Sequence, residues 1–179
     1  MKKKKSIKII LLLLVPLLVG VTIAYLIATA SKTNSFTVGN VEASVSKTYS
    51  SQTKETTNVR VQNTGNVDSY IRLSIVYSKR LSDGTIIGEE PVLGTDYTVT
   101  LSSSSKWLLS QDGYYYYTDR VSPNGYTDNI IDSFRSLLTG DEDLYLQVVA
   151  EAIQADPSRA VSEAWVNTTV TNGSLSLIR

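Results

Sequence analysis

The chain has 179 residues, of which 42% are hydrophobic, enough for one domain with its own core and some additional segments. It contains neither cysteine nor histidine. These absences exclude a disulfide framework, thiolate and histidine metal sites, and the Ser-His-Asp and Cys-His catalytic arrangements.

Charge is balanced overall but unevenly placed. The sequence has 17 basic and 17 acidic residues, and five of the basic ones lie within the first eight positions. All acidic residues follow position 40, so the chain without its N-terminus carries a net charge of −5. Because this mildly acidic body has no basic patch, nucleic acid is not an expected partner.

Residues 1–24 have the pattern of an export signal. Lys2 to Lys5 form a positive region, and an apolar run follows from Ile9 to Ala24. If the apolar stretch continues towards Ala30, it reaches about 20 residues and would also span a bilayer uncleaved. Export with cleavage is the favoured interpretation, so contact with the membrane is expected only before the signal is removed.

Two positions fit signal cleavage. A cut after Ala24 leaves Tyr25 as the first residue, whereas a cut after Ala30 in the A-x-A pattern leaves Ser31. The second cut implies an apolar stretch of about 20 residues, which is long for a signal peptide.

The first strand of the mature chain is expected over residues 36–46. Phe36 and Val38 share one phase of alternation, and the phase changes at Gly39-Asn40, where a bulge or bend is expected. Residues 48–57 are polar and rich in Ser and Thr, which predicts a connecting loop.

The best-defined pair of strands lies in residues 58–77. Val59 and Val61 alternate with polar residues, and the apolar positions of the second run recur with a period of two, at Ile71, Leu73, Ile75 and Tyr77. Between them, residues 63–66 read Asn-Thr-Gly-Asn, which favours a turn. The remaining strands are expected to add to this pair.

Short strands and turns follow. A turn at 82–84 precedes a short strand at 85–88, a loop at 89–95 and a strand at 97–101. Residues 107–110 and 114–118 flank Asp112-Gly113 and predict a hairpin. Its four consecutive tyrosines suggest either a ligand-stacking surface or ordinary strand packing with two rings inward and two in solvent. The second interpretation is favoured because aromatic residues prefer strands.

Residues 128–140 show helical spacing at Ile130, Ile131, Phe134, Leu137 and Leu138. A short helix is predicted, capped by Thr127 or Asp128. The acidic run Asp141 to Asp143 is a candidate cation site, because hard cations bind carboxylate oxygens. It lacks the spacing of an EF-hand loop, so a solvated turn is favoured.

The longest strand is predicted at 144–155, and its apolar residues on both faces suggest a central position. Asp156-Pro157 suggests an N-cap and first position of a second short helix, with Trp165 covering one end of the sandwich. Residues 167–179 form a polar tail or a last strand.

Together these elements predict an all-β fold. An antiparallel β-sandwich of jelly-roll or Greek-key type is expected over residues 36–166, with one or two short helices and a preceding signal helix.

Several segments, in this order, resemble the TasA/camelysin family of exported Gram-positive proteins. They read AYLIATASKTNSFTVGNVEASVS after the Lys-rich signal, then VRVQNTGNVDSYIRLSIV, KWLLSQDGYYYYTDRVSPNG, LYLQVVAEAIQAD and EAW. The matching core positions are Phe36, Val38, Gly39, Asn63, Gly65, Tyr70, Arg72, Trp107 and Trp165. The resemblance implies a jelly roll, release by a SipW-type signal peptidase, and the cut between Ala24 and Tyr25.

The function implied by this resemblance is structural. Family members are secreted to the cell surface or biofilm matrix and assemble into fibres, so the expected partners are further copies of the chain and other matrix proteins. In residues 25–35, the apolar Tyr25, Leu26 and Ile27 are the candidate donor strand for a neighbouring subunit. No cofactor is expected.

Two alternatives stand beside this hypothesis. Camelysin relatives carry a metallopeptidase label, but a chain without His or Cys lacks the usual zinc ligands, so peptidase activity is disfavoured. A monomeric surface protein or adhesin is the other alternative.

Overall fold

The computed structural model describes residues 39–178, which belong to one compact unit beginning at Gly39. The predicted signal, both cleavage positions, the candidate donor residues Tyr25 to Ile27, and Phe36 and Val38 lie outside the described residues. Within 39–178, no helix is long and apolar enough to cross a membrane.

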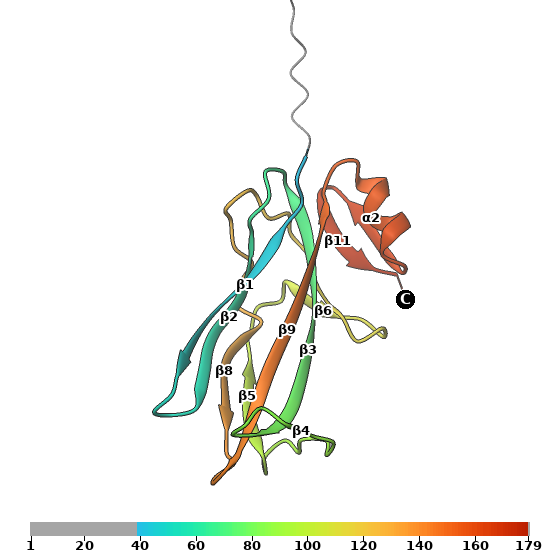
Figure 1. Cartoon of the computed structure of the whole chain (residues 1–179). Coiled ribbons are helices and arrows are strands. Elements are labelled where there is room, and N and C mark those ends of the chain that lie inside the picture. The colour runs from blue at the N-terminus through green and yellow to red at the C-terminus, as the bar shows by residue number, and fades with distance from the viewer. Residues whose placement is uncertain (1–38, 179) are drawn as a thin grey trace, which may run out of the picture. The chain divides into compact units, whose positions relative to one another are not determined.

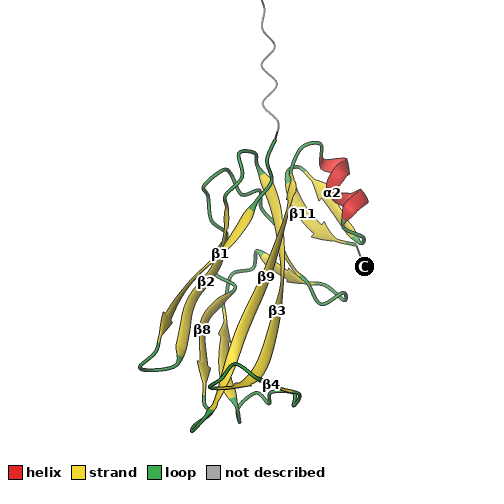
Figure 2. Ribbon diagram, viewed as in Figure 1, coloured by secondary structure: helices red, strands yellow, loops and turns green. Residues whose placement is uncertain are grey.

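The regular structure of the described chain is almost all β-strand, with one short helix, which confirms the predicted fold class (Figures 1 and 2). Its elements are β1 (Ala43–Ser50), β2 (Glu55–Asn63), β3 (Ser69–Leu81), β4 (Ile86–Ile87), β5 (Tyr97–Leu101), β6 (Trp107–Leu109), β7 (Tyr115–Tyr117), β8 (Ile131–Ser136), β9 (Glu142–Gln154), α2 (Ser158–Ala164), β10 (Thr168–Thr171) and β11 (Ser174–Leu177).

Two antiparallel sheets form the sandwich. The first has the order β1-β2-β8-β5, and the second has the order β4-β3-β7-β6 with β9 on the other edge of β3. From β2 onward the chain passes repeatedly from one sheet to the other. Buried aliphatic and aromatic residues of both sheets meet in one main core, including Val59, Ile71, Leu73, Ile131 and Leu146.

A second, smaller core lies on the outer face of the β3 sheet. Tyr70 alternates with Ile71 on β3 and joins Tyr116, Val161, Trp165 and other buried residues of the C-terminal segment. Trp165 therefore packs on the outer face of the β3 sheet, beside the start of β3 and the end of β9. Residues 168–177 form the β10–β11 hairpin, so the predicted last strand is present and is part of a hairpin.

The helix predicted within 128–140 is wrong, because residues 131–136 form β8 between β2 and β5. The register of β8 against β5 shifts by one residue at Asp132. This bulge places Ile131 and Phe134, three positions apart, on the same buried face. A bulged strand has therefore produced the spacing that ordinarily indicates a helix.

Two further boundaries differ from expectation. The loop predicted at 48–57 is mostly strand, because Thr48 pairs with Thr57 and Tyr49 with Thr56 across the β1–β2 hairpin. Threonine and tyrosine favour strands despite being polar. At the other end of the chain, the helix α2 begins at Ser158 with Pro157 as its N-cap, one residue later than predicted.

Candidate functional site

Two strands expose a free edge on the same side of the sandwich. β9 pairs with β3 along all thirteen of its residues, and β1 pairs with β2. Among the described strands, neither has a partner on its other edge. The prediction that the chain's longest strand is central is therefore wrong, because β9 lies at an edge. Free backbone N–H and C=O groups make such edges able to accept another strand.

The edges of β1 and β9 lie close where the chain enters and separate towards the other end (Figure 1). Between them is a cavity of about 340 Å³. Its lining residues come from β1, β2, β8, β9 and the β1–β2 turn: Lys47, Tyr49, Lys54, Thr56, Phe134, Asp143, Leu144, Tyr145 and Leu146. We call this cavity, with its two free edges, the β1–β9 slot.

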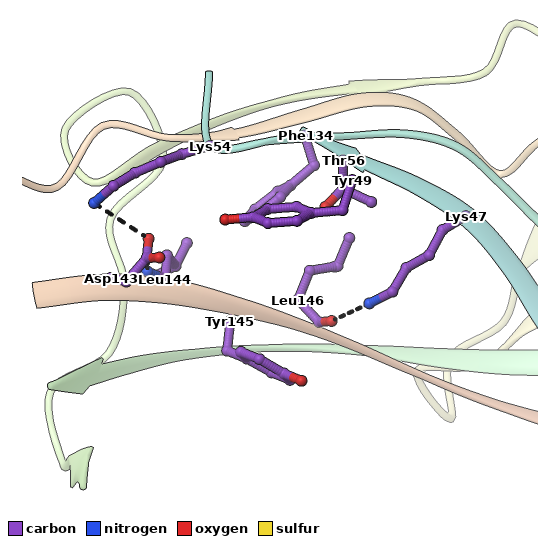
Figure 3. Close-up of a pocket in the computed structure, with 9 residues that line it drawn as sticks. All are labelled: Lys47, Tyr49, Lys54, Thr56, Phe134, Asp143, Leu144, Tyr145 and Leu146. Atoms are coloured by element: carbon purple, nitrogen blue, oxygen red, sulfur yellow. Dashed lines mark hydrogen bonds and ion pairs between the residues drawn. The ribbon is translucent and has the colours of Figure 1, made fainter. Parts of the chain in front are cut away.

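The floor of the slot is apolar. Phe134, Leu144 and Leu146 are at most 6% exposed, and their side chains point towards one another from opposite sheets (Figure 3). The Phe134 ring lies 5.6 Å from that of Tyr77 and 5.7 Å from that of Tyr97. These rings support the floor from β3 and β5.

Tyr77 remains uncharged over the physiological range. Burial, with a smaller contribution from the neighbouring hydroxyls of Tyr97 and Tyr115, raises the pKa of Tyr77 to about 12. The Tyr77 and Tyr97 rings are stacked with centroids 4.7 Å apart. An apolar side chain entering the slot would therefore meet a neutral, rigid surface.

Charged side chains lie at the mouth of the slot. Lys47 Nζ donates a hydrogen bond to the Leu146 carbonyl oxygen at 3.3 Å. Lys54 Nζ lies 3.7 Å from Asp143 Oδ1 and donates to the Leu138 carbonyl oxygen at 3.3 Å. Both members of the Lys54–Asp143 pair are more than a third exposed, so the pair contributes little to stability.

Tyr145 of β9 lies at the rim of the slot. Its ring points away from Leu144 and Leu146 (Figure 3) and is 51% exposed. The Arg80 guanidinium lies 4.2 Å from the centre of this ring, a cation–π contact that fixes its orientation. A second, shallower cavity of about 380 Å³ adjoins the slot here, and Lys47 lines both cavities.

This arrangement is suited to binding an added strand. The slot combines an apolar floor with backbone edges, the two features that an added β-strand uses. In residues 39–178, no three acidic side chains gather closely enough to hold a metal ion. Asp141 and Glu142 of the acidic run are exposed, and Asp143 faces Lys54.

No family model, no curated protein and no solved structure significantly matches this chain. The function of the slot is therefore inferred from its geometry.

Three of the family-like motif positions form a corner remote from the slot floor. Asn63 is fully buried, its amide donates to the carbonyls of Val67 and Val121 at 2.8 Å, and its carbonyl accepts from the Gly65 N–H at 3.0 Å. A Cβ on Gly65 would lie 2.3 Å from the Asn40 carbonyl oxygen. These residues, with Gly39 nearby, are structural.

Three other motif positions meet in the second core. Arg72 forms a two-pronged ion pair with Glu151 at 2.7 and 2.9 Å, and its guanidinium lies 5.1 Å from the Trp165 ring. The hydroxyl of Tyr70 donates to the Gly173 carbonyl oxygen at 2.8 Å. These contacts attach the C-terminal segment to β3. Trp107 lies apart, donating from Nε1 to the Asp128 carbonyl oxygen at 3.1 Å.

The hairpin predicted at 107–118 is confirmed by the β6–β7 pairing. The prediction that two of its tyrosines face solvent is wrong, because all four are buried or half-buried. Tyr115 and Tyr117 enter the main core, while Tyr114 and Tyr116 enter the second core. In a two-layer sandwich the outer face of the β3 sheet would be exposed to solvent. Here the C-terminal segment from α2 to β11 covers part of that face.

The slot itself was not predicted. Three of its lining residues, Tyr49, Lys54 and Thr56, lie in residues 48–57, which were predicted to be a loop. Lys47 directly precedes that predicted loop. One signal was present, since Val45, Lys47 and Tyr49 alternate with Ser46 and Thr48 as on a strand. The free edges themselves depend on strand order, which alternation does not reveal.

Proposed function

We propose that this protein is an exported structural protein of the cell surface or extracellular matrix, and that its copies join by adding a strand from one copy to the β1–β9 slot of the next. The observation that carries the proposal is the pair of long free edges flanking an apolar slot. The resemblance to the TasA/camelysin family supports the same function.

The proposed donor is the segment 25–35 that signal cleavage would free. Eleven residues in an extended strand span about 36 Å, against about 43 Å for the thirteen residues of β9. A donor of this length would cover most of the exposed edge. Its apolar start, Tyr25 to Ile27, provides side chains for the floor formed by Phe134, Leu144 and Leu146.

Head-to-tail addition explains why such a contact would give filaments. A donor on one surface and an acceptor on another form a heterologous interface, which continues from copy to copy unless its rotation closes a ring. Before cleavage, the donor would remain continuous with the apolar signal. Cleavage would therefore permit assembly.

The proposal is tested by removing the donor. The secreted protein and a variant lacking residues 25–35 are purified, their N-termini are sequenced, and both are examined by electron microscopy and light scattering. We expect filaments from the first protein and a folded monomer from the second. Adding the detached 25–35 peptide should block filament growth by occupying the slot.

Two results would contradict the proposal. Filaments from the truncated variant would show that the segment is not the donor. A secreted protein that stays monomeric at all concentrations would indicate that the segment folds back into its own slot, or that the protein is an accessory or adhesive monomer.

A further inference from the structure

Lys47 occupies an unusual place for a charged residue. It shares its face of β1 with Ala43 and Val45, whose side chains pack against the main core. Opposite Lys47, the pairing of β1 with β2 is interrupted, with Asn58 and Val59 facing this single residue. Natural edge strands carry inward-pointing lysines and bulges because both obstruct pairing with another strand.

The contacts of Lys47 lie at one end of the slot, opposite the Lys54–Asp143 pair (Figure 3). Its ammonium group donates to the Leu146 carbonyl oxygen, and it lies 5.9 Å from the centre of the Tyr145 ring. Lys47, Tyr145 and Leu146 line both the slot and the cavity beside it, so Lys47 lies where the two cavities adjoin. In the part of the chain described, no carboxylate lies within ion-pair distance of Lys47.

We propose that Lys47 is a removable guard of the β1–β9 slot, which holds the acceptor closed until a strand with enough apolar side chains displaces it. This inference rests on the proposed function. A strand added to β9 would use the Leu146 carbonyl oxygen for its own backbone N–H, so the lysine hydrogen bond must break. The ammonium group must also leave for water, because the entering strand would bury it.

The guard lowers affinity for every strand by about the same amount, so it raises the apolar burial that a strand needs in order to bind at a given concentration. A segment with a strongly apolar start compensates for this cost through burial of its side chains, whereas a polar segment does not. Lys47 thus disfavours edge-to-edge association of the exposed β9 with unrelated strands.

The test compares the concentration of secreted protein above which filaments form. Lys47→Ala and Lys47→Ser both remove the donor to Leu146, and the serine variant adds no apolar surface. Lys47→Arg keeps a long donor. Because a hydrogen bond from a charged group is worth about 1.5 kcal/mol or more, we expect the critical concentration to fall about tenfold in the Ala and Ser variants. It should change little for Arg.

A matched control is Lys106→Ala, which removes a half-exposed lysine whose partners are Asp119 and Asp128. We expect its critical concentration to equal that of the wild type. Thermal unfolding of the monomers distinguishes an assembly effect from a folding defect. Loss of the Lys47 hydrogen bond should lower the melting temperature by only a few degrees and leave unfolding cooperative.

The possible results separate the two proposals. If the wild type and Lys47→Ala assemble at the same concentration, the guard is refuted while strand addition stands. If neither protein assembles, strand addition is refuted, and the proposed role of Lys47 is refuted as well. If Lys47→Ser behaves as the wild type while Lys47→Ala assembles sooner, added apolar surface explains the effect, and the guard is again refuted.

Discussion

Asn63 holds the corner between β2 and β3 through hydrogen bonds rather than through packing. Its buried amide satisfies two backbone carbonyls and one backbone N–H, which come from three positions in the chain. The sequence indicated a turn here from the Asn-Thr-Gly-Asn run alone. It did not show that the first Asn is buried or that it bonds Val121, because that contact joins residues 58 positions apart.

Replacing Asn63 with alanine should therefore be costly. Two carbonyls and one N–H would each lose one hydrogen bond, worth about 1 kcal/mol apiece. They would keep another, because Ser69 also donates to both carbonyls and the Gly65 N–H also donates to Glu42. We expect the free energy of unfolding to fall by about 3 kcal/mol, measured by urea denaturation. Asn129→Ala, at a half-exposed residue, serves as the control and should cost less than about 1 kcal/mol. An equal loss in both variants would contradict the assigned role of Asn63.

Among the elements, β8 is the one whose type was predicted wrongly, as a helix instead of a strand. The apolar residues Ile131 and Phe134 recur at helical spacing, yet the segment is a bulged strand between two others. In a regular strand every second residue faces the same side, but the extra residue of a bulge lets residues three positions apart share a face. This spacing is also the spacing of a helix. In contrast, β3 and the β6–β7 hairpin were predicted correctly, because their alternation is regular or their turn residues are distinctive.

The C-terminal segment is an element whose attachment can be tested. Trp165 is 4% exposed and packs edge-on against Tyr116 at 5.5 Å between ring centres. We expect Trp165→Ala to destabilise the fold by about 3–5 kcal/mol, measured by chemical denaturation. Val166→Ala, whose side chain is 73% exposed, should change stability by less than about 0.5 kcal/mol. A stable Trp165→Ala variant would mean that the second core is dispensable.

On the scale of the whole molecule, the fold class was readable and the candidate site was not. Alternating residues revealed most strands and hence the sandwich. Whether a strand is central or at an edge depends on its neighbours in space, as the error over β9 demonstrates. Because the slot exists only where two edges from different sheets come together, no local pattern of residues could locate it.

The two sheets are also joined by a buried ion pair. Lys79 of β3 lies 2.9 Å from Asp96, next to β5, and both side chains are about one-tenth exposed. Hydrogen bonds to Asp96 from the Val92 N–H and from Lys79 lower the pKa of its carboxyl below the usual 3.8. A lowered folded-state pKa gives stability that is present above the unfolded pKa and is lost as the pH falls.

This sign gives a testable pH dependence. Stability should decline as the pH falls from about 5 through 3.8 and below, because Asp96 must take up a proton. Asp96→Asn should be less stable than the wild type at pH 7, and the difference should shrink at pH 2. Melting temperatures measured across this range test it. A difference that stays constant with pH would show that the Asp96 charge is not the cause.

The thirteen-residue ladder between β3 and β9 has a mechanical consequence. If a neighbouring copy adds its strand to β9, tension along the filament runs parallel to these strands. The ladder's hydrogen bonds lie across that direction, so they are sheared together rather than opened one after another. The load would then be shared by the longest paired region in the described structure, and the subunit would resist stretching most strongly beside the joint.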